Sequence, residues 1–156
     1  WIHGTLDGIG ERAGNANLPE IAFALEALYQ IDTGFRFDLV RKASERLRQI
    51  AGYQLEPWKS LVGDTLFVRE TGAVAAQFHI PEAIEPYSSE LLATSRGIVL
   101  GKKSGLASIK VKCEELGLSV AEDRFPALLA EIKKIAIRKR SLLTDAEFRE
   151  LVATAH

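Results

Sequence analysis

A short segment near the start of the chain carries the residues best suited to contact a small molecule: Gly8, Gly10, Glu11, Arg12, Gly14 and Asn15. The three glycines allow the backbone to approach a ligand closely. The other three residues add a carboxylate, a cation and an amide oxygen, just before a predicted helix N-terminus, where anions are favoured. The glycine spacing, G-x-G-x-x-x-G, is one residue longer than the dinucleotide fingerprint. From the residues alone, the segment is either a ligand-binding loop or a plain strand-to-helix turn with a capping asparagine.

Residues 1–34 are predicted to form the βα unit that positions this loop. Residues 1–6 are strand-like, the next four are a turn signal, and a helix begins near Asn17. Glu20 lies three residues after Asn17, which is a variant of the capping box. The apolar residues that we expect on the buried face of this helix are Ile21, Ala22, Leu25, Leu28 and Tyr29. A single βα unit cannot bury both faces of its strand, so we expect it to belong to a larger sheet or barrel.

The rest of the chain is predicted to be mostly helical. Helical periodicity covers residues 38–51, in a linker helix region spanning 35–60, and residues 125–138. A short helix is expected within 63–78, an extended run at 97–101, and a helix capped by Ser104 and closed by Gly117. Thr144 and Glu147 form a capping box that opens a last helix. We therefore expect residues 61–156 to form a helical C-terminal subdomain.

Composition narrows the classes of protein that the chain can represent. Its 156 residues are 47% hydrophobic, and 20 basic residues balance 21 acidic ones to a net charge of −1. This excludes a disordered chain and argues against a nucleic-acid partner. No run approaches the roughly 20 apolar residues that span a bilayer, so no membrane is expected. The single cysteine, Cys113, falls on an apolar stripe, which indicates core packing and a cytoplasmic protein without disulfides.

The loop also carries a resemblance to a known family. The run Gly4-Thr5-x-x-Gly8-Ile9-Gly10-Glu11-Arg12-Ala13-Gly14-Asn15-Ala16 resembles the last strand and loop of the catalytic barrel in the 2-isopropylmalate, homocitrate and citramalate synthases. These are metal-dependent acyltransferases with a TIM barrel like that of HMG-CoA lyase. Later stretches at residues 62–64, 70–72 and 98–105 look like the helical region that follows this barrel. The resemblance covers only the C-terminal portion of such enzymes, and the chain also opens without methionine, so we expect a fragment of a longer protein.

The resemblance implies a fold, a reaction and partners. The fold would be a mainly α-helical fragment with little β-structure: the last βα unit of a TIM (β/α)8 barrel, followed by a helical C-terminal region. The family condenses acetyl-CoA with a 2-oxo acid in amino-acid biosynthesis, using a divalent metal (Mg, Mn or Zn) as a Lewis acid. Asn15 would contribute to the metal site, and the glycines of the loop, with Glu11 and Arg12, would shape the substrate site. A homodimer through the helical region is also implied.

Two departures from the family pattern bear on activity. The Asp and the H-x-H pair that bind the metal in the family are absent, and His3, His79 and His156 are too scattered to replace them. The family usually reads Glu-Ser-Gly-Ile-His where this chain has Glu70-Thr71-Gly72-Ala73-Val74, and that His reaches the partner subunit's active site. Either His79 substitutes for it or the parent enzyme works without it. We therefore expect the fragment alone to be inactive. The alternative is a non-catalytic helical module for dimerisation or protein interaction.

Overall fold

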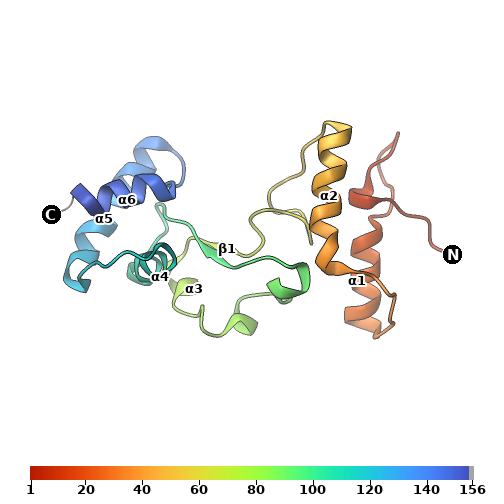
Figure 1. Cartoon of the computed structure of the whole chain (residues 1–156), viewed down its shortest axis with the longest axis horizontal. Helices are drawn as coiled ribbons and strands as arrows, with labels where there is room; N and C mark the ends of the chain where they lie inside the picture. The colour runs from red at the N-terminus through yellow and green to blue at the C-terminus, as the bar shows by residue number, and fades with distance from the viewer. Residues whose placement is uncertain (155–156) are drawn as a thin grey trace. The chain divides into compact units, whose positions relative to one another are not determined.

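The computed structural model describes residues 1–154 and is mainly helical, as the sequence predicts (Figure 1). The helices are α1 (Leu18–Tyr29), α2 (Phe37–Ala51), α3 (Gly72–Ala75), α4 (Leu106–Leu116), α5 (Phe125–Lys139) and α6 (Asp145–Thr154). The strands are β1 (Val68–Arg69) and β2 (Gly97–Ile98), and short 3-10 turns lie at Leu6–Gly8, Pro81–Ala83, Ser89–Leu92 and Glu122–Arg124. None of the helices in the described part of the chain is long and apolar enough to cross a bilayer.

The chain divides into two compact units. Unit 1 comprises Trp1–Leu66 and Tyr87–Ser95, and unit 2 comprises Phe67–Pro86 and the chain from Arg96 onward. The chain therefore passes from unit 1 into unit 2, returns to unit 1 for the nine residues Tyr87–Ser95, and then continues in unit 2.

Unit 1 is built around α1, α2 and the returning segment. The rings of Phe23 in α1 and Phe37 in α2 meet edge to face with centroids 5.7 Å apart, and Tyr87 packs on Phe23 at 4.9 Å. Val40 and Leu92 are buried in the same unit. Edge-to-face contacts between aromatic rings contribute stability beyond that of the apolar area they bury. These rings therefore hold α2 against α1.

Two predictions for the first βα unit are wrong. Residues 1–6 form no strand: Thr5 alone makes a parallel bridge to Asn17, because no neighbouring strand lies beside it in residues 1–154. The side chain of Asn17 makes no cap hydrogen bond, so the Asn-x-x-Glu box is not formed.

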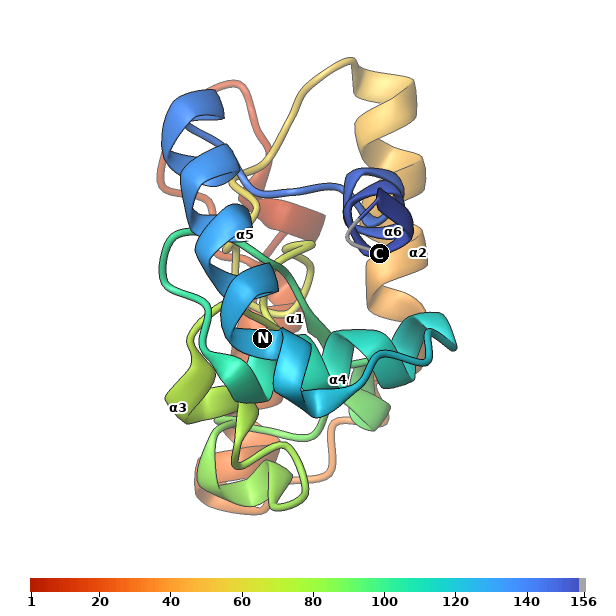
Figure 2. The same ribbon diagram turned by 90° about the vertical axis from the view of Figure 1, so that its left-hand side faces the viewer.

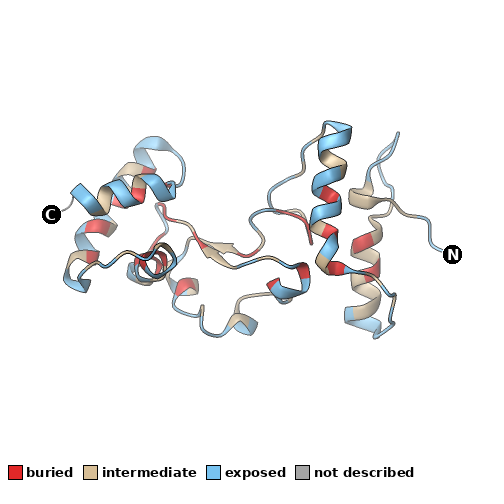
Figure 3. Cartoon of the chain, viewed as in Figure 1, coloured by how far each residue is buried: buried red, intermediate tan, exposed pale blue. Residues whose placement is uncertain are grey.

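The face of α1 that was expected to be buried is only partly covered. Ala22 is buried, but Leu28 and Tyr29 are 75% and 69% exposed (Figure 3). The apolar periodicity of α1 is typical of a helix with one buried face. Among the described residues, however, none covers the side chains at the C-terminal end of α1.

Unit 2 contains one continuous apolar core. Its strands pair in parallel, Val68 with Gly97 and Arg69 with Ile98. α5 packs against both α4 and α6, as two views of the chain show (Figures 1 and 2). The core side chains are Ala75, Ile98, Leu100, Ile109, Cys113, Phe125, Leu128, Ile132, Ala136, Leu143 and Phe148. Cys113 is buried as predicted, and burial raises the pKa of its thiol.

Helix ends in unit 2 agree with the sequence at one place and differ at another. The capping box of α6 is confirmed, because the Thr144 amide donates to Glu147 Oε2 at 2.7 Å and the Glu147 amide donates to Thr144 Oγ1 at 3.2 Å. Ser104 is not the cap of α4. Gly105 holds that position, and Ser104 Oγ instead accepts a hydrogen bond from the Gly101 amide at 2.9 Å, which closes the preceding turn.

The capping box predicts a pH dependence of stability. Hydrogen bonds from Lys139 and from the backbone and side chain of Thr144 lower the pKa of Glu147 to about 2, from an ordinary value of 4.5. A carboxyl whose pKa is depressed by folding contributes stability above its unfolded pKa and loses it as pH falls toward the folded value. Wild-type unit 2 should therefore lose thermal stability between pH 4.5 and 2. The Glu147→Gln variant should be less stable at pH 7 and lose less over that interval. Identical melting curves for the two proteins at every pH would contradict this.

Candidate functional site

The base of the glycine-rich loop (residues 8–15) is closed by backbone hydrogen bonds. The Thr5 amide donates to Ala16 O at 2.9 Å, and the Leu18 amide donates to Thr5 O at 3.0 Å. Gly4 lies so close to the returning chain that a Cβ there would be 2.9 Å from Ala16 O. The loop thus begins and ends at one point beside the N-terminus of α1.

Inside the loop, the side-chain amide of Asn15 packs against Gly10. Asn15 Nδ2 donates to Ile9 O at 3.2 Å, and a Cβ on Gly10 would lie 1.8 Å from that nitrogen. Gly8 and Gly14 have positive φ angles of 72° and 94°, which glycine adopts without strain. Glycine at these positions lets the Asn15 amide fold back across the loop.

The charged residues of the loop lie apart from this contact. Glu11 and Arg12 are exposed, as is Gly14. The structure therefore groups Gly8, Gly10 and Asn15 and leaves the carboxylate and the guanidinium at the tip, available to a ligand or a further segment.

A hydrogen-bonded cluster that the sequence did not predict is centred on Asp7, the residue immediately before the loop. Asp7 Oδ2 accepts hydrogen bonds from Ser44 Oγ at 2.6 Å and from Tyr53 OH at 2.9 Å. Ser44 is 0% exposed although it lies on α2 between apolar positions. Burial, reinforced by the hydrogen bond to Asp7, raises the pKa of Tyr53 to about 12. A serine on the apolar stripe of α2, four residues after Val40, was the available signal, because such a residue needs a buried partner.

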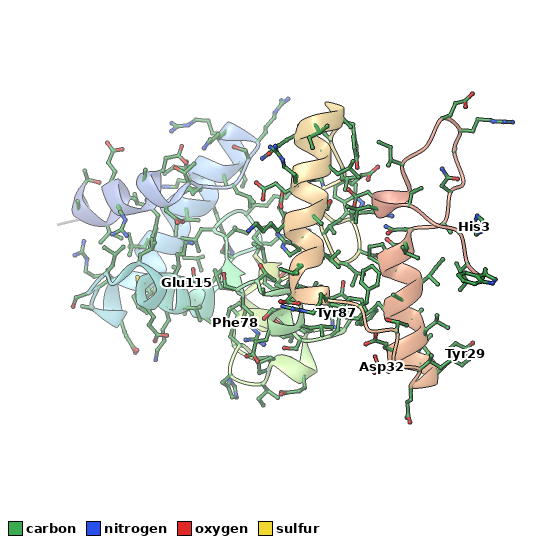
Figure 4. The ribbon with its side chains drawn as sticks, turned by 45° about the vertical axis from the view of Figure 1, so that its right-hand side comes forward. His3, Tyr29, Asp32, Phe78, Tyr87 and Glu115 are labelled. Atoms are coloured by element: carbon green, nitrogen blue, oxygen red, sulfur yellow. The ribbon has the colours of Figure 1, made fainter. Side chains whose placement is uncertain are left out.

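The described residues fit a metal only as part of a larger site. No group of three or more His, Cys, Asp or Glu side chains able to hold a metal occurs within residues 1–154. His3, which Figure 4 labels, and His79 are both exposed and lie in different units, and His156 lies outside the described residues. In Asn15 the amide nitrogen is engaged with Ile9, so the oxygen is the atom that can ligate a hard cation. The loop can thus supply one oxygen ligand.

The later motifs of the resemblance meet each other in unit 2. Glu70 Oε1 accepts a hydrogen bond from the Lys103 amide at 2.8 Å, and Glu70 O accepts one from Ser108 Oγ at 3.1 Å. A Cβ on Gly72 would lie 2.6 Å from Gly105 Cα. The Glu-Thr-Gly and Gly-Lys-Lys-Ser-Gly stretches are therefore two sides of one packing contact, which explains their residue types without a ligand. The side chains of Lys102 and Lys103 are exposed to solvent.

Comparison with known proteins identifies the class. No family model matches the chain. Over nearly its whole length, however, the chain is related to citramalate, homocitrate and 2-phosphonomethylmalate synthases, which confirms the family resemblance seen in the loop.

Particular relatives show how much of such a protein the chain represents. It is 37% identical over 154 residues to a putative (R)-citramalate synthase of Archaeoglobus fulgidus, a match that covers 98% of this chain and 31% of the relative. It is 38% identical to a homocitrate synthase of Methanopyrus kandleri, covering 97% and 38%. It is 35% identical to a 2-phosphonomethylmalate synthase of Streptomyces rubellomurinus, covering 97% and 41%. The chain thus spans about a third of the length of these relatives, which fits the C-terminal portion that the sequence predicts.

Proposed function

We propose that the chain is the C-terminal portion of a transferase that condenses acetyl-CoA with a 2-oxo acid. The observation that carries the proposal is the glycine-rich loop, which folds the Asn15 amide back across Gly10 beside a helix N-terminus. The relatedness to citramalate and homocitrate synthases supports it. In the reaction, the acetyl methyl group would lose a proton to a base and its carbon would add to the 2-oxo carbon, whose oxygen would take up a proton to become a hydroxyl. Water would then cleave the thioester to give the carboxylic acid and release CoA.

In this proposal, residues 1–34 complete a (β/α)8 barrel as its last βα unit. The open face of α1, where Leu28 and Tyr29 are exposed, is what such a unit shows when its neighbouring strands are not beside it. The Thr5 segment, which forms a single bridge here, would pair as a strand with those neighbours. Residues 35–60 would link the barrel to the helical subdomain of residues 61–156.

The loop residues have separate roles in the proposal. Asn15 would supply an amide oxygen to a divalent metal (Mg, Mn or Zn) whose other ligands come from the rest of the barrel. When bound, the metal would polarise the carbonyl of the 2-oxo acid. Gly8, Gly10 and Gly14 would let the backbone approach the substrate, while Glu11 and Arg12 would organise the exposed tip.

Turnover tests the proposal. The chain would be expressed with the remaining two thirds of the Archaeoglobus fulgidus relative, and CoA release from acetyl-CoA would be followed with a panel of 2-oxo acids. We expect no release by the chain alone, whose described residues hold no metal cluster, and metal-dependent release by the assembled pair. A stable pair that binds Mn²⁺ yet releases no CoA with any 2-oxo acid would contradict the proposal.

A second candidate function is a non-catalytic helical module that dimerises or binds a protein, and the exposed apolar side chains favour it. In unit 2, Ile137 and Leu142 are 64% and 43% exposed and line a hollow of about 330 Å³. In the catalytic proposal the same helical region would form a homodimer of a cytoplasmic enzyme.

Light scattering tests self-association through this region. It should give twice the 17.2 kDa mass of the chain for wild type, and the monomer mass for the Ile137→Glu variant. Self-association without turnover in the assembled pair would favour the module, and a monomer at all concentrations would contradict a dimer through this region.

A further inference from the structure

The backbone at Asp7 sets the direction in which the glycine-rich loop leaves the body of unit 1. Asp7 has φ 59° and ψ 5°, and Gly8 follows with φ 72°. A left-handed conformation is uncommon for a residue other than glycine, and aspartate adopts it where its side chain is hydrogen-bonded, as the Asp7 carboxylate is. Two consecutive left-handed residues reverse the chain, and Ile9 then begins the outward path of the loop.

The contacts that hold Asp7 come from residues far along the chain. Oδ2 accepts one hydrogen bond from Ser44 on α2 and one from Tyr53 beyond its end. Both donors are neutral hydroxyls, and Ser44 has no exposed surface. The carboxylate is therefore fixed to α2 by two directional contacts of 2.6 and 2.9 Å.

The same contacts reach Asn15 through a short path. Ile9, two residues after Asp7, accepts the Asn15 Nδ2 hydrogen bond on its carbonyl oxygen. The far end of the loop is already held by Ala16 O, which accepts from the Thr5 amide. The orientation of the Asn15 amide thus depends on where Ile9 lies, and Ile9 depends on Asp7.

We propose that Asp7 is a positioning residue, which Ser44 and Tyr53 anchor to α2 and which thereby holds Ile9 and the Asn15 amide in one orientation. This inference rests on the proposed function of Asn15 and identifies the residues that hold the Asn15 side chain in place. Burial and the hydrogen bond to Asp7 raise the pKa of Tyr53 to about 12, so its hydroxyl remains a donor through the neutral range.

The test uses a breaking variant, a rescue and a matched control. Asp7→Ala removes the acceptor, Asp7→Asn keeps an oxygen that can accept both hydrogen bonds, and Tyr53→Phe removes one donor without changing shape. Tyr87→Phe is the control, since its hydroxyl also lies in unit 1 but accepts from the Leu61 amide, away from the loop.

The first readout is tryptic cleavage of the full chain after Arg12, the exposed arginine of the loop, followed by mass spectrometry. We expect Asp7→Ala and Tyr53→Phe to raise this rate about fivefold or more, because loss of a buried hydrogen bond favours local opening. The cleavage rate of Asp7→Asn should lie between the rates of these two variants and that of wild type, and the rate of Tyr87→Phe should equal that of wild type. Equal rates in all variants, or an equal rise in Tyr87→Phe, would overturn the positioning role.

The second readout is turnover by the assembled pair described above. Asp7→Ala should lower kcat about tenfold or more with a smaller change in KM for acetyl-CoA, and Asp7→Asn should restore part of it. If wild type has no turnover while cleavage after Arg12 still follows the expected order, the proposed function fails and the anchoring of the loop stands. If cleavage follows that order but kcat does not change in an active pair, the positioning of Asn15 is overturned.

Discussion

The Gly72→Ala variant should lose about 3 kcal/mol of unfolding free energy in unit 2. A Cβ at Gly72 would lie 2.6 Å from Gly105 Cα and 2.9 Å from Gly105 N. Both obstacles are backbone atoms, which cannot rotate aside as a side chain can. Relief would require α3 to move away from the start of α4, and Glu70 ties these segments together by accepting from Lys103 and Ser108.

Denaturant unfolding of the full chain measures this loss, and Gly97→Ala is the matched control. Gly97 lies in β2 of the same unit, but a Cβ there would have no atom within 4 Å. The control should change the unfolding free energy by no more than about 0.5 kcal/mol. Equal losses in the two variants would show that the close approach of Gly72 and Gly105 does not limit stability.

The Asn15→Ala variant should reduce kcat/KM of the assembled pair about 100-fold, if Asn15 contributes to the metal site. The amide oxygen is the atom expected to contact the metal, because the nitrogen is engaged with Ile9 O. The concentration of Mn²⁺ that gives half-maximal turnover should rise in the same variant.

The matched control for this variant is Gln54→Ala, an exposed amide of unit 1 outside the loop, which should leave turnover and its metal dependence unchanged. An Asn15→Ala enzyme with the wild-type response to Mn²⁺ would remove Asn15 from the metal site, even if its turnover were lower for another reason.

Local patterns predicted the elements whose stability is local. α5 keeps one apolar face in register over its length, and the structure places Phe125, Leu128 and Ile132 in the core. The Thr144–Glu147 box closes within four residues, so its geometry follows from sequence spacing. Gly117 ends α4 with a positive φ, as expected for a helix C-cap, and Gly52 ends α2 in the same way.

Features that depend on distant partners could not be predicted in this way. The strand expected at residues 1–6 needs a neighbouring strand, and the described residues offer only the bridge to Asn17. Asp7 was interpreted as a turn residue because its partners, Ser44 and Tyr53, lie 37 and 46 residues away. Of the candidate site, the sequence therefore identified the loop and Asn15 but not the anchor behind them.

The central claim is that this chain completes a condensing enzyme, and CoA release by the assembled pair tests it most directly. With acetyl-CoA, Mn²⁺ and a panel of 2-oxo acids, we expect at least one acid to give CoA release that chelation abolishes and that Asn15→Ala lowers. Folded pairs that bind Mn²⁺ and release no CoA with any of the acids would contradict the claim.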